Sequence, residues 1–213
     1  MTIRAINEFH IHYEKSRIWE KTKWLGVPCY KLPFDAFILQ EIIWNIQPDF
    51  VIETGTAKGG AAVFYATILE MIGEEGMVLT SDIVDKSINQ KIPKKLLNRI
   101  EFLHGGSTNP IIFDYIQSQT QGKKNVVILD SDHSYDHVKQ EISMYSTLVP
   151  VDSYMVVEDT HANGHPVPWK WGKGPYEAVQ DFLKINNEFW EADYECEKYL
   201  MTFNPLGYLR RVK

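Results

Sequence analysis

The sequence predicts an α/β fold, a doubly wound and mostly parallel sheet with N-terminal helices and an antiparallel C-terminal hairpin. Two observations favour it. From residue 49 onward, short apolar runs alternate with amphipathic helical segments, which is typical of a parallel sheet with helices on both faces. Several of these runs also end in a glycine-rich turn or in carboxylates, at the strand ends where α/β sheets bind ligands.

Size and composition indicate one domain of 213 residues, with an N-terminal helical segment (1–48) and a core (49–213). The net charge of -6 argues against a nucleic-acid partner, because such proteins usually carry a basic face. No apolar run approaches the ~18 residues of a membrane span, and the N-terminus has no secretory pattern, so we expect no membrane partner. Two distant cysteines, Cys29 and Cys196, fit a reducing cytoplasm.

Residues 8–45 are predicted to be helical, with breaks at Gly26-Val-Pro28 and at Leu32-Pro33. The expected parallel strands are short and apolar, and they span 50–53, 77–82, 100–104, 125–130 and 154–158. The expected helices span 60–72, a basic segment containing Lys91, Lys94, Lys95 and Arg99, then 110–119, 134–148 and 175–189. A Gly/Pro/Trp-rich loop covers 160–173, and strands at 198–203 and 207–212 would form the hairpin. Together these elements describe a Rossmann-like core.

The first core strand runs into a glycine turn, Val51-Ile-Glu-Thr-Gly-Thr-Ala-Lys-Gly-Gly60, which would let a nucleotide cofactor approach the backbone. The spacing of Glu53, Gly55 and Gly59 is not the dinucleotide pattern. A carboxylate here would repel a pyrophosphate but suits an amine-bearing cofactor, which favours S-adenosylmethionine over NAD. Asp82 ends the next strand and could engage a ribose, and Gly105-Gly-Ser107 would lie near the adenine. Alternatively, Glu53 is a capping or salt-bridge residue and the glycines serve packing.

Carboxylates also end two later strands, at Asp130 and at Glu158-Asp159. Three acids that converge cannot all stay ionised without a cation or raised pKa values, and Mg²⁺ prefers such oxygen ligands. We therefore predict a divalent-cation site at Asp130, Glu158 and Asp159. The alternative is that acids such as Asp132 or Asp159 only cap a following turn.

His133, three residues after Asp130, is the predicted general base for a hydroxyl group, although a histidine at a helix start can also be a cap. We expect His137 to lie on a helix face and His104 to be structural. His161 and His165 could line the acceptor pocket or add ligands. A zinc site is not favoured, because paired Cys/His spacing is absent from the sequence.

Four motifs resemble those of one known family, the cephalosporin hydroxylase family, whose members look like S-adenosylmethionine-dependent methyltransferases. The motifs are Ile52-Glu-Thr-Gly-Thr56, Leu129-Asp-Ser-Asp-His133, Val157-Glu-Asp-Thr160 with Asn163-Gly-His-Pro166, and Gly174-Pro-Tyr-Glu-Ala178. In the related catechol and caffeoyl-CoA O-methyltransferases, the acids matching Asp130 and Glu158-Asp159 hold a divalent cation, and a lysine stands at the position of His133. The resemblance implies that Glu53 lies at the amino group of the cofactor and Asp82 at its ribose.

One departure from the catechol-type pattern concerns the cofactor carboxylate. Ala61 replaces a serine that contacts this group, so the contact would come from Thr56 or the backbone. The predicted cofactor site comprises Glu53, Gly55, Thr56, Gly59, Gly60, Asp82, Gly106, Ser107 and Asp130.

These features predict an S-adenosylmethionine-dependent, Mg²⁺-assisted O-methyltransferase that acts on a hydroxyl group of a small molecule, either a natural product or a sugar. An iron-dependent hydroxylase using His133, His161 and Asp130, or a non-catalytic binding module, are the alternatives. The aromatic residues Trp24, Trp169, Trp171 and Tyr176 could wall the acceptor pocket, and we expect a homo-oligomer.

Overall fold

The computed structural model describes residues 3–73, 75–84, 92, 94–168 and 172–213. Its centre is a seven-stranded sheet in the order β5-β4-β3-β6-β7-β9-β8. The strands are β3 (Phe50–Thr54), β4 (Met77–Asp82), β5 (Ile100–His104), β6 (Asn125–Leu129), β7 (Tyr154–Val157), β8 (Trp190–Ala192) and β9 (Tyr208–Arg211). The first five are parallel, and β9 and β8 add an antiparallel edge. The predicted fold class is confirmed.

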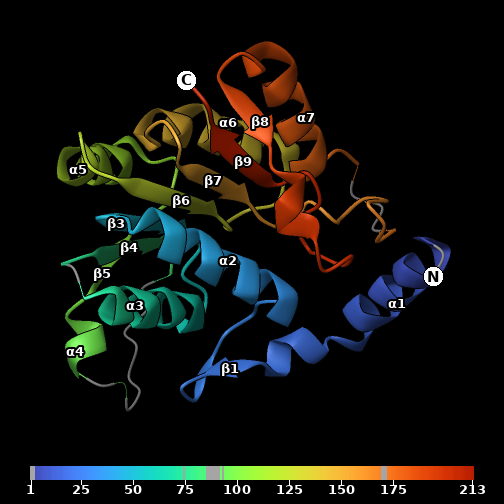
Figure 1. Cartoon of the computed structure of the whole chain (residues 1–213), viewed down its shortest axis with the longest axis horizontal. Helices are drawn as coiled ribbons and strands as arrows, with labels where there is room; N and C mark the ends of the chain where they lie inside the picture. Colours follow the sequence, from blue (N-terminus) through green and yellow to red (C-terminus); the bar gives the residue numbers. More distant parts are fainter. Residues whose placement is uncertain (1–2, 74, 85–91, 93, 169–171) are drawn as a thin grey trace.

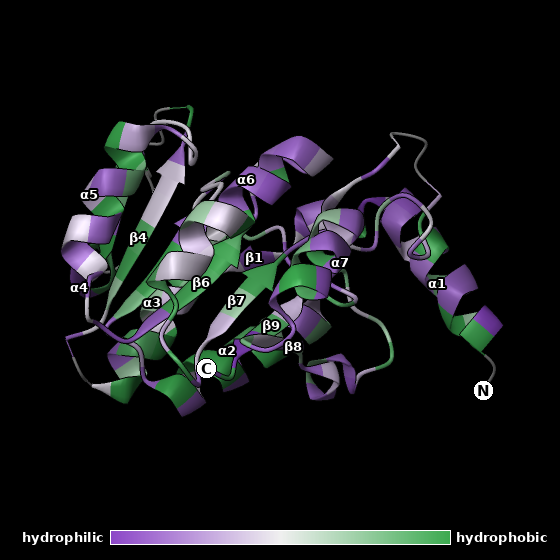
Figure 2. Ribbon diagram, turned by 90° about the horizontal axis from the view of Figure 1, so that it is seen from above, coloured by the Kyte–Doolittle hydropathy of each residue, from purple (hydrophilic) through white to green (hydrophobic). Residues whose placement is uncertain are grey.

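Helices cover both faces of this sheet. The helices are α1 (Ile3–Ser16), which extends away from the sheet (Figure 1), α2 (Pro33–Ile46), α3 (Gly60–Ile72), α4 (Lys94–Leu97), α5 (Pro110–Thr120), α6 (Tyr135–Tyr145) and α7 (Pro175–Asn186). Figure 1 shows α2 and α3 on one face and α5, α6 and α7 on the other. Two apolar cores result, because β6 and β7 are buried on both faces and are hydrophobic along most of their length (Figure 2).

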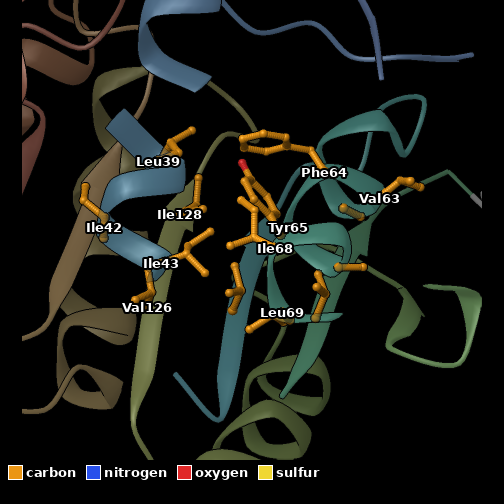
Figure 3. Close-up of a cluster of buried hydrophobic side chains, with 14 of the residues drawn as sticks. Leu39, Ile42, Ile43, Val63, Phe64, Tyr65, Ile68, Leu69, Val126 and Ile128 are labelled. Atoms are coloured by element: carbon orange, nitrogen blue, oxygen red, sulfur yellow. The ribbon is translucent and has the colours of Figure 1, made fainter. Parts of the chain in front are cut away.

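The apolar core under α2 and α3 shows how the N-terminal segment packs against the sheet. Ile43 of α2 lies beside Val126 and Ile128 of β6, and Leu69 of α3 belongs to the same buried cluster (Figure 3). Between α1 and α2 the chain forms η1 (Ile18–Lys21) and a small sheet of β1 (Lys23–Trp24) and β2 (Val27–Pro28), which was not predicted. The positive φ of Leu25 and Gly26 closes this tight turn.

The basic helix is shorter than predicted. Only Lys94–Leu97 is helical in the described part, Arg99 lies beyond its end, and Lys91 falls outside the described residues. Trp169 and Trp171, proposed for the acceptor pocket, also lie outside them.

The prediction of a strand at 198–203 was wrong, because the antiparallel partner of β9 is β8. Residues 198–203 instead turn back towards the start of α2. There Asp35 accepts hydrogen bonds from the Thr202 hydroxyl (2.6 Å) and the Phe203 N–H (2.8 Å). The left-handed φ of Leu200 (68°) also breaks an extended run. The N–H of Phe203 is therefore used by a buried carboxylate and is not available to a β-ladder.

The register of the strands brings the strand ends that carry the predicted site residues side by side. Thr54 at the end of β3 pairs with Ser81 of β4 and with Leu129 of β6, and Leu129 pairs with Val157 of β7. The residues that follow these strands therefore emerge at one edge. Strand order reverses between β3 and β6, which is the point where doubly wound sheets open a crevice. None of the described helices combines the length and apolarity needed to cross a bilayer.

Candidate active site

The turn after β3 fits tightly against the loop after β6, and glycine makes this contact geometrically feasible. Gly55 has φ 84°, and a Cβ on it would lie 1.9 Å from the carbonyl oxygen of Asp130. Gly59, with φ 77°, precedes α3 as its N-cap. Because any larger residue at position 55 would push the two loops apart, the glycine sets the spacing between the predicted cofactor turn and Asp130.

Gly60 has a different role in the geometry. A Cβ there would lie 2.1 Å from the carbonyl oxygen of Pro28, so the start of α3 packs directly on the backbone after β2. This is the packing alternative considered for the glycines, and it applies to Gly60.

A cleft of about 460 Å³ lies above this edge of the sheet. Four of the predicted cofactor residues line it, namely Gly55, Asp82, Gly106 and Ser107. Gly105, which was expected near the adenine, also lines it, and the lining residues that sequence reasoning missed are Ser81, Ile83, Val84, Ser131, Asp132 and His137. Asp82 is held in place because its carboxylate accepts hydrogen bonds from the N–H groups of Ala57 and Val84, both at 2.9 Å.

Glu53 lies fully buried beneath the turn. Its Oε2 accepts a hydrogen bond from the Thr80 hydroxyl (2.6 Å), and the Thr80 and Thr56 hydroxyls lie 2.7 Å apart. Within the described residues, its Oε1 and the buried hydroxyl of Ser81 have no hydrogen-bond partner. Burial raises the pKa of Glu53 to about 7, against the opposing effect of the nearby Lys31 ammonium. A buried carboxylate with an open oxygen suits an amine-bearing cofactor.

One wall of the cleft is a polar network of Ser107, Ser131, His137 and Glu141. Ser131 donates to the buried Glu141 carboxylate at 2.7 Å, and His137 Nε2 lies 3.0 Å from the Ser131 hydroxyl and 3.1 Å from that of Ser107. The hydrogen bond between Glu141 and His137 raises the pKa of His137. The i, i+4 spacing of His137 and Glu141 on one helix was the signal for this pair, whereas His137 had been assigned only to a helix face.

The second part of the site gathers Asp130, His133 and Asp159. His133 Nε2 lies 3.1 Å from Asp159 Oδ2 and 4.0 Å from Asp130 Oδ1. Each of the three offers one ligand atom, and these atoms all lie within 4.8 Å of one another, close enough to hold a metal ion between them. Of the three acids predicted to converge, Asp130 and Asp159 belong to this group, and its third member is His133, the predicted general base, rather than Glu158.

Glu158 is not one of these three residues. It is buried, and its Oε2 lies 2.5 Å from the Nζ of Lys31, which also contacts Asp130 Oδ2 at 2.7 Å. Burial and the neighbouring Asp130 charge raise the pKa of Glu158 well above its usual range. Burial lowers the pKa of Lys31, but Asp130 and Glu158 outweigh it and the pKa lies well above normal. Sequence reasoning missed Lys31, because its partners lie 99 and 127 residues away and no motif surrounds it.

Helix α1 contributes a buried cluster next to Asp159. Glu14 Oε2 lies 3.9 Å from His161 Nε2, and His161 Nδ1 lies 3.9 Å from Asp159 Oδ1. Burial raises the pKa of Glu14 to about 7 and lowers that of His161 to about 3. His10 stacks on Phe203 at a ring-centroid distance of 5.4 Å. His161 is thus adjacent to the acid group but is not one of its three members.

Two other predicted residues have local partners. His165 Nε2 lies 2.9 Å from Glu177 Oε1, and its ring stacks on Tyr176 with 3.7 Å between centroids. Asp132 accepts a hydrogen bond from the N–H of Ser134 (2.7 Å), which is the capping role considered for it.

Comparison with known proteins identifies the family. The model of the Rhamnosyl O-methyltransferase/CmcI family matches residues 16–212. The chain belongs to this family. The rhamnosyl O-methyltransferase of Mycobacterium bovis (strain BCG / Pasteur 1173P2) is 37% identical over 207 residues, covering 96% of this chain and 84% of that protein. The Mycobacterium leprae (strain TN) protein is 36% identical and is covered over 89% of its length. The predicted resemblance and the predicted class of enzyme, an O-methyltransferase, are confirmed.

Solved structures share the fold at lower identity. CmcI with Mg and SAM has a TM-score of 0.68 and 17% identity, over 91% of this chain and 78% of that one. The MycE methyltransferase of the mycinamycin biosynthetic pathway, in complex with Mg, SAH and mycinamycin VI, has a TM-score of 0.59 and 16% identity, over 95% of this chain and 53% of that one.

Proposed function

We propose that this enzyme transfers the methyl group of S-adenosylmethionine to a sugar hydroxyl of a small-molecule acceptor, with the assistance of a divalent cation such as Mg²⁺. The observation that carries the proposal is the group of Asp130, His133 and Asp159 directly beside the Gly55 turn. The relatives named rhamnosyl O-methyltransferases support a sugar acceptor, and the neighbours solved with Mg and SAM or SAH support both cofactors.

The cofactor would lie in the cleft above the sheet. The Oε1 of Glu53, buried beneath the turn and without a partner in the described structure, would accept a hydrogen bond from its amino group, and Asp82, which lines the cleft, would engage its ribose. Gly106 and Ser107 would lie at the adenine side, while Gly55, Thr56 and Gly59 supply the turn beneath. S-adenosylmethionine brings an electrophilic methyl group, so the main contribution of these residues is to hold it in line with the acceptor.

The acid group would bind the cation and the acceptor hydroxyl. Asp130 and Asp159 would hold the cation, and Glu158 would join them through the oxygen Oε1 that has no partner in the described structure. A divalent cation bound there would lower the pKa of an acceptor hydroxyl group next to it. His133 is partly exposed and would take the proton at the ring nitrogen that does not face Asp159, because its Nε2 lies 3.1 Å from Asp159 Oδ2 and would donate to that carboxylate.

The iron-dependent hydroxylase is the weaker candidate. Non-haem iron oxygenases use two histidines and one carboxylate, whereas the group in the described part of this chain has one histidine and two carboxylates. The homo-oligomer and the cytoplasmic location stay predictions. Exposed aromatic side chains on α2, namely Phe34, Phe37 and Trp44, favour the former.

The proposal is tested by mass spectrometry of products formed from S-adenosylmethionine, MgCl₂ and a panel of rhamnose-bearing acceptors. We expect His133→Ala to lower kcat by about 10²- to 10⁴-fold, the usual loss for a general base, while the Kd for S-adenosylhomocysteine measured by calorimetry stays unchanged. His12→Ala, at an exposed position on α1, is the matched control and should keep full activity. Wild-type turnover by His133→Ala would refute its role, and undiminished activity in EDTA would refute the cation.

A further inference from the structure

Lys31 occupies an unusual position for a lysine. Only 4% of its side chain is exposed, and its ammonium group lies between two carboxylates, at 2.7 Å from Asp130 Oδ2 and 2.5 Å from Glu158 Oε2. Lysine is rarely buried to this extent unless it is paired. Here the pairing uses two of the three acids that were predicted to bind a cation.

From this geometry we infer that Lys31 is an internal counter-ion that competes with the divalent cation for Asp130 and Glu158, and so sets the cation affinity of the site. The inference rests on the proposed function. Asp130 meets Lys31 with Oδ2 and His133 with Oδ1, so one carboxylate belongs to both the ion pair and the metal-binding group.

Charge balance explains why a buried ammonium group lies beside these acids. Asp130, Glu158 and Asp159 lie on the ends of adjacent strands, and Glu158 is buried, so three negative charges without a counter-ion would destabilise the cation-free enzyme. The ammonium group compensates part of that charge. The same positive charge repels an incoming divalent cation, so the compensation weakens cation binding.

The position of Lys31 is fixed by the backbone before it. The N–H of Lys31 donates to the carbonyl of Cys29 at 2.9 Å. Pro28 and Cys29 in turn lie against Gly60, where a Cβ would approach the Pro28 carbonyl oxygen to 2.1 Å. The start of α3 therefore supports the segment that delivers the ammonium group to the acids.

The test is a titration of Mn²⁺ into the full-length enzyme by calorimetry, without cofactor or acceptor. We expect Lys31→Met to bind Mn²⁺ at least about ten-fold more tightly than the wild type, since removing one charge within a few ångström of a divalent ion gives this much even in a high-dielectric medium. Lys31→Arg, which keeps the charge, should bind as the wild type does. Lys23→Met, at an exposed lysine on the same N-terminal segment, is the matched control and should leave the Kd unchanged.

Asp130→Asn separates this inference from the proposed function. If the wild type binds Mn²⁺ and Asp130→Asn does not, the cation site is supported. Unchanged or weaker Mn²⁺ binding by Lys31→Met would then overturn the proposed competition by Lys31 but not the cation site. If neither wild type nor Lys31→Met binds Mn²⁺, both proposals fail. Should Lys31→Met fold only when Mn²⁺ is present, the cation has replaced the ammonium group and the inference is supported. Should it not fold under either condition, the same titration of Lys31→Gln decides, with tighter binding supporting the competition and unchanged or weaker binding overturning it.

Discussion

The close contact at Gly55 allows a quantitative prediction for Gly55→Ala. A Cβ at this position would lie 1.9 Å from the Asp130 carbonyl oxygen, while ordinary van der Waals contacts begin at about 3.4 Å, so the turn and the Asp130 loop must separate by roughly 1.5 Å. A misplacement of about 1 Å costs an enzyme on the order of 10²-fold in rate. We therefore expect Gly55→Ala to lose about 10²-fold in turnover and to weaken S-adenosylhomocysteine binding.

Gly73→Ala is the matched control for backbone strain. Gly73 has φ 88°, close to the 84° of Gly55, but a Cβ there would meet nothing within 4 Å. Both variants pay the cost of an L-residue in the left-handed region, about 1–2 kcal/mol of folding stability. Only Gly55→Ala should lose affinity in calorimetric titration with S-adenosylhomocysteine. Equal affinity of Gly55→Ala and wild type would refute the assignment of this turn to the cofactor.

Two further predictions concern stability. Asp35→Ala should lower the free energy of unfolding, measured in urea, by ~2–4 kcal/mol, because the buried hydroxyls of Thr202 and Tyr208 lose their acceptor. A loss below about 1 kcal/mol, which is typical of a surface substitution, would contradict this. The pKa of Glu14 is raised from 4.5 to about 7, so its protonated form stabilises the fold below pH 4.5 and this contribution is lost as the pH rises to about 7. The stability of Glu14→Gln relative to wild type should therefore increase between pH 5 and pH 8, by no more than about 3 kcal/mol, in parallel urea titrations; a difference independent of pH would rule this out.

The sequence predicted the parts of the site that depend on local signals. Apolar runs that end in Glu53, Asp130 and Asp159 define strands by composition and length, and the rule that parallel strand ends meet at one edge brings the acids together. His133 follows because it is three residues from Asp130. These are short-range patterns, and in the structure Asp130, His133 and Asp159 lie in one group, while Glu158, which was expected in it, contacts Lys31 instead.

Contacts between distant segments were not predictable in this way. Lys31 reaches Asp130 across 99 residues, and Glu14 reaches His161 from a helix with no motif. The strand predicted at 198–203 failed for the same reason. Its Tyr199, Thr202 and Phe203 are residue types that favour strands, but the buried carboxylate of Asp35 accepts the hydrogen bonds of Thr202 and Phe203.

The glycine turn has two partners, and this connects the cofactor cleft with the acid group. Gly55 contacts the backbone of Asp130, and Gly60 contacts the backbone of Pro28 and Cys29, just before Lys31. The turn therefore fixes both segments whose side chains meet in the ion pair of Lys31 and Asp130. A substitution at either glycine would alter this ion pair without changing a charged residue, because protein interiors are close-packed and transmit such shifts. Cofactor binding at the turn and cation binding at the acids thus depend on one short stretch of backbone.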